Sequence, residues 1–362
     1  MIRLILPLLL VLAGSPAVAQ TPSPAPLPDR LVIAHRGASA ERPEHTRAAY
    51  ELAIAQGADM IEPDLVMTRD GVLVARHENE IGETTDVAAR PEFADRRRAA
   101  VIDGYPVTGW FTEDFTLAEL RTLRARERLP ALRPASAVFD GTDGILTFEE
   151  VLDIAAEGSR RTGRTIGVAP ELKHPGHFAT LGLDMETALV AILTARGLTG
   201  SDAPVLIQCF EVGPLERLAQ RVDTPRLQLI AAGGAPADQP DLPYTAMLSD
   251  AGLARVRAYA SAIGVEASLV LARNTNGSRA GVTDLVARAH GAGLKVIAWT
   301  FRPENAFLPS DLRQGDPAAP DAAAGRGDFE TWLSDGWAAG LDGLFTDLVP
   351  PAAATRPGNG RR

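Results

Sequence analysis

The stretch MIEPDLVMTRDGVLVARHE (residues 60–78) decides how the rest of this chain is interpreted, because it reads as a strand, a tight Asp-Gly turn and a return arm. Glu62 and Asp64 are two residues apart, so an extended backbone directs both carboxylates to the same side. The return arm then brings His77 back toward them. We therefore expect two acids and an imidazole to converge, which suits a divalent cation beside an acid/base group.

Short apolar runs alternate with amphipathic helical patterns along the chain, and this alternation predicts an α/β fold. Eight strands, each followed by a helix, indicate a parallel (β/α)8 TIM barrel whose active site lies at the carboxyl ends of the strands. A weakly patterned segment, about residues 79–144, is interpreted as a small insertion after the second strand, with one short helix after Thr116. The expected strands are residues 31–34, 60–65, 165–171, 204–209, 226–231, 262–265, 294–300 and 343–346. The expected helices begin after Thr46 and Thr147 and near residues 184, 213, 253, 284 and 329.

The two ends of the chain are assigned no part in the barrel, which we place at residues 29–350. Residues 1–19 combine a basic start, an apolar run and a small-residue cleavage site, the pattern of an export signal peptide. Residues 20–28 form a Pro-rich linker, and residues 351–362 form a tail that we expect to be disordered. The sequence thus predicts a periplasmic or secreted protein without stable membrane insertion after signal cleavage.

The composition is that of an ordinary globular protein, with 46% hydrophobic and 23% charged residues in a chain of 362. A formal net charge of −10 argues against a nucleic-acid partner, since binding to phosphates requires a basic surface. Cys209 is the only cysteine, so no intrachain disulfide forms and stability must come from the core. These features leave an exported, soluble enzyme or binding protein, with its oligomeric state open.

Three acids at the ends of predicted strands are the candidate metal ligands: Glu62, Asp64 and Glu171. A solvated strand face would also explain the first two, but their neighbours along the strand are apolar. Three converging carboxylates repel one another, and a divalent ion removes this penalty. Oxygen ligands favour Ca²⁺, with Mg²⁺ as the alternative. Pro63, between the two acids, suggests that the second strand ends there.

Two histidines and two basic residues complete the candidate site. His35 alone would be interpreted as a core histidine, but with His77 it forms a pair in which one imidazole takes a proton and the other gives one. Arg36 offers a planar fork for two phosphate oxygens, and Lys173 adds a point charge. This combination indicates a phosphoryl site. The other histidines lack such support and are interpreted as surface or structural: His45, His174, His177 and His290.

Six blocks in chain order resemble the glycerophosphodiester phosphodiesterase family, specifically its exported (periplasmic) bacterial type. They are HRGASAERPEHT (35–46), GADMIEPDLVMTRDG (57–71), the histidine at 77, PELK (170–173), LIQCFE (206–211) and GLFTD (343–347). The resemblance covers nearly the whole mature chain. It implies a barrel enzyme that hydrolyses small-molecule glycerophosphodiesters, such as glycerophosphocholine and glycerophosphoethanolamine, to sn-glycerol 3-phosphate and an alcohol. It also implies a role in the metabolism of glycerol and phospholipid breakdown products. Calcium is the cofactor that the resemblance commonly implies.

The same resemblance assigns roles to individual residues of this chain. It implies a metal on Glu62, Asp64 and Glu171, and acid/base work by His35 and His77, with His35 expected as the base. It implies binding of the substrate phosphate by Arg36 and Lys173, with Glu44 orienting Arg36 or His35. Phe210 and Trp299 are expected to form an apolar wall for the glycerol, although a purely core role explains each equally well.

One difference from the family pattern and two rival functions remain. The family usually has His-Asp where this chain has His77-Glu78. The sequence therefore does not determine the loop geometry at His77, although activity is expected to survive. The insertion resembles the family's lid segment in position and leaves substrate choice open. A phospholipase D-like enzyme could stop at a cyclic phosphate in the same fold. A periplasmic phosphodiester-binding protein is the other alternative, but binding alone needs no pair of proton carriers.

Overall fold

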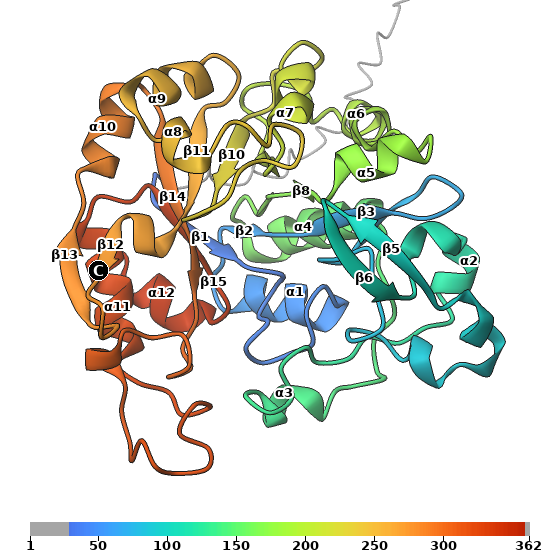
Figure 1. Cartoon of the computed structure of the whole chain (residues 1–362), viewed down its shortest axis with the longest axis horizontal. Helices are drawn as coiled ribbons and strands as arrows, with labels where there is room; N and C mark the ends of the chain where they lie inside the picture. Colours follow the sequence, from blue (N-terminus) through green and yellow to red (C-terminus); the bar gives the residue numbers. More distant parts are fainter. Residues whose placement is uncertain (1–28, 359–362) are drawn as a thin grey trace, which may run out of the picture.

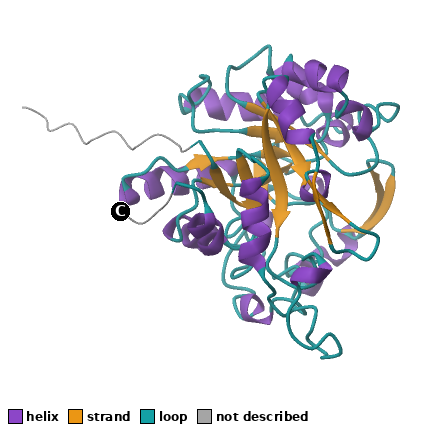
Figure 2. Cartoon of the chain, turned by 90° about the vertical axis from the view of Figure 1, so that its left-hand side faces the viewer, coloured by secondary structure: helices purple, strands orange, loops and turns teal. Residues whose placement is uncertain are grey.

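The computed structural model describes residues 29–358, in which the barrel strands form one parallel sheet surrounded by helices (Figures 1 and 2). The sheet runs in the order β4-β3-β8-β9-β10-β11-β14-β15-β1-β2-β7. β2 and β3 are halves of one barrel strand, as are β7 and β8, so the two ends of this order meet. The sheet therefore closes with eight parallel strands in the described residues, which confirms the predicted TIM barrel.

The barrel strands lie close to their predicted bounds. They are β1 (Leu31–Ala34), β2 (Met60–Ile61) with β3 (Asp64–Met67), β7 (Gly167–Val168) with β8 (Glu171–Leu172), β9 (Ile207–Cys209), β10 (Arg226–Ile230), β11 (Ala262–Glu266), β14 (Lys295–Phe301) and β15 (Gly343–Thr346). The return arm is β4 (Leu73–Ala75), which pairs antiparallel with β3 as the Asp-Gly turn predicts.

Pro63 does not end the second strand, so that part of the sequence prediction is wrong. Ile61 pairs with Val168 before the interruption, and Asp64 pairs with Glu171 after it, three residues further along each strand. The register is therefore unchanged across the prolines, since a residue without an N–H removes a ladder bond without shifting its neighbours. This continuity places the carboxylates of Asp64 and Glu171 side by side.

Local capping explains where the first helices begin. α1 (Arg47–Ala55) starts after Thr46, whose side chain accepts a hydrogen bond from the Ala49 N–H, and α4 (Phe148–Thr162) starts with a capping box between Thr147 and Glu150. The other predicted helices are present as α6 (Met185–Ala195), α7 (Val212–Leu218), α9 (Asp250–Arg257), α10 (Leu285–Gly291) and α11 (Phe329–Ala338). Two further short helices were not predicted, α5 (Pro175–Thr180) and α8 (Tyr244–Met247).

The core has two layers, as a barrel requires. A large apolar cluster lies between the sheet and the helices, and a smaller one that includes Ile33, Leu227 and Phe345 fills the barrel interior. Cys209 is buried and unpaired with another cysteine. In the part of the chain that the structure describes, no helix is both long and apolar enough to cross a bilayer.

The segment at residues 79–144 has more regular structure than the single helix expected. α2 (Leu117–Leu120) follows Thr116 as predicted, and α3 (Pro134–Ala137) comes later. A hairpin of β5 (Arg98–Ile102) and β6 (Tyr105–Gly109) was not predicted. Asp103 and Gly104 at its tip have φ of 49° and 86°, the sign that a type I′ turn requires. The Asp-Gly pair was therefore the sequence signal that could have revealed this hairpin.

The C-terminal tail differs from its prediction of disorder. α12 (Val349–Thr355) starts with two prolines in its first turn, where the missing N–H groups would have no helical acceptor. The prolines of this segment thus start a helix. The predicted signal peptide and linker (residues 1–28) and the last four residues (359–362) lie outside the described part of the chain.

Candidate active site

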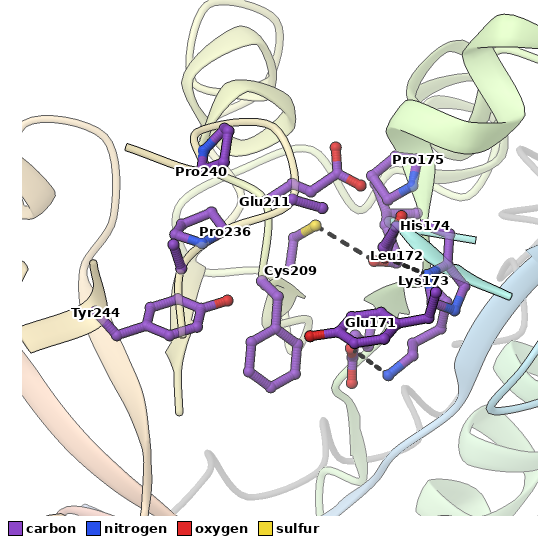
Figure 3. A pocket seen from close by; sticks show the side chains of 15 residues that line it. Glu171, Leu172, Lys173, His174, Pro175, Cys209, Glu211, Pro236, Pro240 and Tyr244 are labelled. Carbon is purple, nitrogen blue, oxygen red and sulfur yellow. Dashed lines mark hydrogen bonds and ion pairs between the residues drawn. The ribbon is translucent and has the colours of Figure 1, made fainter. Parts of the chain in front are cut away.

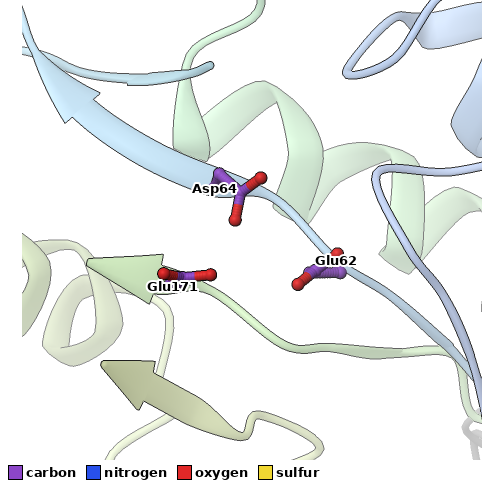
Figure 4. A group of neighbouring side chains, drawn as sticks. All are labelled: Glu62, Asp64 and Glu171. Carbon is purple, nitrogen blue, oxygen red and sulfur yellow. The ribbon is translucent and has the colours of Figure 1, made fainter. Parts of the chain in front are cut away.

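Three carboxylates converge at the carboxyl ends of two neighbouring barrel strands (Figure 4). Asp64 and Glu171 are register partners in β3 and β8, and Glu62 comes from the interruption just before β3. One oxygen of each lies within 4.8 Å of those of the other two, and all three side chains are buried. The structure thus brings together the three predicted metal ligands, although Glu171 lies over a hundred residues from the other two in the sequence.

The charges in this cluster fit a divalent cation. Burial and the adjacent carboxylates raise the pKa of Glu62. Burial also raises the pKa of Glu171 to about 8, although Lys173 Nζ lies 2.8 Å from its carboxylate. Asp64 Oδ1 is buried and has no hydrogen-bond partner in residues 29–358. A bound divalent ion would satisfy this oxygen and remove the mutual repulsion, and oxygen donors alone suit calcium or magnesium.

His45 holds Asp64 in place, a role that the sequence did not reveal. The His45 Nε2 lies 3.0 Å from Asp64 Oδ2, and its Nδ1 lies 2.8 Å from the Tyr50 hydroxyl. Burial lowers the pKa of His45, so a neutral ring donates from Nε2 and accepts from Tyr50. The ring is fully buried, so the structural interpretation of His45 holds and the surface one does not.

His35 is fixed by a carboxylate at the end of β15. Its Nδ1 lies 2.6 Å from Asp347 Oδ1, while the other Asp347 oxygen accepts from Arg133 at 2.5 Å and lies 3.2 Å from Arg302 Nε. Burial and the nearby Arg36 lower the pKa of His35 to about 4, so the ring is neutral. With Nδ1–H donating to Asp347, His35 Nε2 carries a free lone pair and lies 4.0 Å from Glu62.

His77 lines the same pocket, with a different set of partners. Its Nδ1 hydrogen-bonds Glu78, and its Nε2 lies 3.2 Å from Lys173 Nζ. Burial, together with the charges of Arg36 and Lys173, lowers the pKa of His77 to about 3. The ring is therefore neutral, although Glu78 and Asp64 oppose this shift.

Arg36 is locked between two carboxylates. Its Nη1 donates to Glu44 Oε2 at 3.0 Å, its Nε lies 3.2 Å from Asp64 Oδ2, and its backbone N–H donates to Glu62 Oε2 at 3.0 Å. The backbone of Arg36 has φ of 59°, the left-handed conformation that non-glycine residues rarely adopt. The hydrogen bond from Arg36 to Glu44 agrees with the predicted role of Glu44 in orienting Arg36.

These groups line one pocket of about 240 Å³. Phe210 and Trp299 form an aromatic corner in it, with their ring centroids 5.7 Å apart and nearly perpendicular. Trp299 Nε1 donates to the Gly264 carbonyl at 3.0 Å, which fixes the indole at the wall. Of the predicted site residues, only Glu44 and Asp64 are absent from the pocket lining, and both lie behind Arg36.

Comparison with known sequences decides the family. The sequence profile of the Glycerophosphoryl diester phosphodiesterase family matches residues 35–349. The chain belongs to this family. A glycerophosphodiester phosphodiesterase of Arabidopsis thaliana is 36% identical over 329 residues, which are 88% of this chain and 83% of the relative. A glycerophosphodiester phosphodiesterase of Treponema pallidum is 27% identical over 321 residues, or 80% of this chain and 84% of that protein.

Solved structures agree on the fold. A phosphodiesterase of Oleispira antarctica in complex with the product sn-glycerol-3-phosphate has a TM-score of 0.58 at 21% identity, covering 91% of this chain and 96% of that one. A glycerophosphodiester phosphodiesterase of Agrobacterium tumefaciens has a TM-score of 0.51 at 18% identity, covering 90% and 99%. The predicted family and enzyme class are confirmed, while plant and bacterial relatives together support no subtype.

The glutamate that replaces the usual aspartate of the family, Glu78, has a partner from the inserted segment. Arg128 donates to Glu78 and also to Glu44, with its shortest contact 2.6 Å to each carboxylate. The longer side chain of Glu78 reaches both His77 and Arg128. Arg128 thus joins the residue behind His77 to the residue behind Arg36, and sequence patterns did not indicate this connection.

Three other residues around the site were missed as functional candidates. Asp347, which directly follows β15, holds His35. Gln208 donates to Glu62 Oε1 at 3.0 Å, and its own oxygen is buried without a partner among the described residues. Arg302 lines the pocket beside His35. The position of Asp347 and Gln208 at the ends of barrel strands was the available signal for both.

Proposed function

We propose that this chain hydrolyses glycerophosphodiesters to sn-glycerol 3-phosphate and an alcohol. The observation that carries the proposal is the convergence of three carboxylates, two neutral imidazoles and two cationic side chains on one pocket. The names of the relatives and the product complex of the Oleispira antarctica protein support the same reaction. The chain would act on breakdown products of phospholipids and return glycerol phosphate to metabolism.

A divalent cation, calcium first and magnesium as the alternative, would be held by Glu62, Asp64 and Glu171. Such an ion supplies positive charge that stabilises the phosphoryl oxygens as negative charge builds up on them. Arg36 and Lys173 offer further charge on the same pocket, and Arg36 is already oriented by Glu44. A phosphate placed between them would thus meet donors that need no reorganisation.

His35 is proposed as the base and His77 as the acid. The lone pair on His35 Nε2 can take the proton of the nucleophile, because Asp347 holds the other ring nitrogen and stabilises the imidazolium that forms. The nucleophile is the glycerol 2-hydroxyl, whose oxygen bonds to phosphorus as the bond to the alcohol breaks. The bound anionic substrate opposes the lowering of the His77 pKa by Arg36 and Lys173, and the protonated ring then gives its proton to the departing alcohol oxygen. Water then opens the cyclic phosphate, with the two histidines exchanging roles.

The chain is also proposed to be exported, as its first residues suggest. Residues 1–19 have the features of a signal peptide, and one cysteine in the whole chain makes folding independent of disulfides. We therefore propose a periplasmic or secreted enzyme of the exported bacterial type. Comparison of the N-terminal sequence of the purified protein with that of the full chain tests this, since an intact residue 1 would contradict it.

A coupled assay for sn-glycerol 3-phosphate, with glycerophosphocholine as substrate, tests the reaction. We expect activity that is lost after exhaustive chelation and restored by calcium. His35→Ala and His77→Ala, assayed separately, should each lose about a hundredfold or more in kcat. His290→Ala is the matched control, because His290 is exposed and contacts only Asp342 outside the pocket. Full activity without metal, or in both pocket variants, would refute the proposal, and phosphorus NMR would show whether the cyclic phosphate accumulates.

A further inference from the structure

A second cavity, of about 400 Å³, lies beside the proposed active-site pocket (Figure 3). We call it the side cavity and define it by Asp103, Tyr105, Phe210, Glu211 and Tyr244. The two spaces share a border that is formed by Glu171, Lys173 and Phe210. A diester with its phosphate at this border would therefore have one half in the pocket and the other half in the side cavity.

Glu211 gives the side cavity a carboxylate without an ion pair among the described residues, because the nearby Arg217 is hydrogen-bonded to Glu186 instead. Its side chain is buried, and its carboxylate accepts only the Gly176 N–H, at 3.1 Å to each oxygen. Glu211 forms no ion pair within residues 29–358. The other two acids of the lining are paired, Glu171 with Lys173 at 2.8 Å and Asp103 with His174 at 2.6 Å. A buried carboxylate without a counter-ion is costly, so this wall favours a positively charged ligand.

The pKa of Glu211 agrees with this charge imbalance. Burial, reinforced by the nearby Asp238, raises it to about 7 although the Gly176 N–H opposes the shift. A cation in the cavity would restore the charged form, since an adjacent positive charge favours a carboxylate.

Aromatic rings form much of the remaining wall. Tyr244 packs against Phe210 with ring centroids 6.2 Å apart, and Tyr105 is 74% exposed at the rim. Figure 3 shows Tyr244 on one side of the cavity and His174 with Lys173 on the other. Aromatic faces attract ammonium groups, above all quaternary ones, through their quadrupoles. Rings and an unpaired carboxylate together make a surface that suits an alkylammonium group.

The inserted segment supplies one wall of the side cavity. Asp103 and Tyr105 lie at and beside the tip of the β5–β6 hairpin, and the hydrogen bond between Asp103 and His174 fastens this tip to the loop after β8. The remaining walls come from the ends of β8 and β9 and from the loop that leads to Tyr244. The insertion therefore shapes the side cavity without contributing to the metal ligands.

We propose that the side cavity receives the alcohol half of the diester and selects a cationic alcohol, one with an ammonium group, over a neutral polyol. This inference rests on the proposed function, because it assumes that the phosphate is bound at the shared border. Glu211 supplies the negative charge that attracts the ammonium group. The aromatic ring faces that contact this group come from Phe210, Tyr244 and Tyr105. Lys173 is assigned to the substrate phosphate at the shared border, so its charge does not offset that of Glu211.

The test compares kcat/KM for three diesters: glycerophosphocholine, glycerophosphoethanolamine and the neutral glycerophosphoglycerol. We expect the unmodified enzyme to prefer the two cationic substrates by about tenfold. Glu211→Gln keeps an acceptor for the Gly176 N–H and removes only the charge, so it should lose most of this preference. Its kcat/KM for glycerophosphoglycerol should change by less than about twofold.

Glu266→Gln is the matched control. Glu266 lines a different cavity that borders the pocket at Trp299, and its carboxylate accepts the Ala232 N–H at 3.2 Å. Glu266→Gln removes a carboxylate charge from this other cavity, and it should keep the preference for the two cationic diesters. Equal rates for all three diesters, an unchanged preference in Glu211→Gln, or an equal loss in Glu266→Gln would each overturn the inference.

Calorimetric binding separates the inference from the proposed function. Choline and its uncharged isostere, in which carbon replaces the quaternary nitrogen, are titrated into the unmodified protein and into Glu211→Gln. Tighter binding of choline in the unmodified protein alone supports a cation site in the side cavity even if no diester is hydrolysed. Equal binding of the two alcohols overturns it even if every diester is hydrolysed.

Discussion

Replacing Arg128 with methionine would test whether the inserted segment positions the catalytic groups. Arg128 Nε and Nη2 donate to Glu44 at 2.8 and 2.6 Å, and Nη1 and Nη2 donate to Glu78 at 3.0 and 2.6 Å. Glu44 in turn holds Arg36, and Glu78 holds His77. The Arg128→Met variant removes four charge-assisted hydrogen bonds and roughly keeps the apolar stem.

The expected loss of stability in Arg128→Met depends on how far the ion pairs of Arg128 with Glu44 and with Glu78 are shielded from water. The Glu44 side chain is only 6% exposed, and losing one partner of a buried pair costs about 3–5 kcal/mol. Glu44 keeps Arg36 as a partner, and the Glu78 side chain is 35% exposed, so its pair contributes little. We therefore expect the free energy of unfolding to fall by about 2–3 kcal/mol. We expect kcat to fall about 10–100-fold, because His77 loses the support that orients it.

Urea unfolding and steady-state hydrolysis of glycerophosphocholine measure the two effects. Arg126→Met is the matched control, since Arg126 is 52% exposed and its carboxylate partner lies 3.6 Å away. Combining Arg128→Met with Glu78→Gln distinguishes positioning from plain destabilisation. If Arg128 acts on His77 through Glu78, the losses in kcat are far from additive. Losses in Arg128→Met no larger than those in Arg126→Met, or full additivity in kcat, would refute this reasoning.

Three further outcomes are expected. Arg133→Met should lower the free energy of unfolding by about 3–5 kcal/mol, because it leaves two buried carboxylates short of a partner. Arg47→Met, at an exposed ion pair of α1, should change it by less than about 0.5 kcal/mol, and similar urea midpoints for the two variants would contradict this. Asp347→Asn should lower kcat about a hundredfold or more with little change in KM, because an amide can hold His35 in the wrong tautomer. A kcat within about twofold of that of the unmodified enzyme would argue against this role of Asp347. Glu119→Gln tests how stability depends on pH. Hydrogen bonds from Arg96, and then from the Thr116 backbone, lower the pKa of Glu119 to about 2. The contribution of this carboxylate to the free energy of unfolding is therefore present above about pH 4.5 and lost as the pH falls toward 2. After allowance for solvent screening, the stability difference from Glu119→Gln should be about 1 kcal/mol at neutral pH and vanish near pH 2, and a constant difference in urea titrations would contradict this.

The sequence by itself determined the barrel and most of the pocket. The runs at residues 31–34 and 343–346 are each followed by a polar residue, His35 and Asp347, and both runs form strands, β1 and β15. Parallel strands direct their carboxyl ends to one face, so residues such as Glu62 and Glu171 could be placed together before any distance was known. Glycines and prolines gave weaker signals, as the hairpin tip at Asp103 and the start of α12 show.

Only the tertiary structure decided which partners hold these groups. Arg128 meets Glu44 across 84 residues, and Arg133 meets Asp347 across 214, through a segment that has little periodicity of its own. The side cavity likewise exists only because a hairpin tip, two strand ends and a distant loop meet at one edge of the barrel. Such contacts depend on barrel closure and on individual side-chain conformations, which no local pattern encodes. The sequence thus determined which groups could react, and the tertiary structure decided which partners hold these groups and which cavity lies beside them.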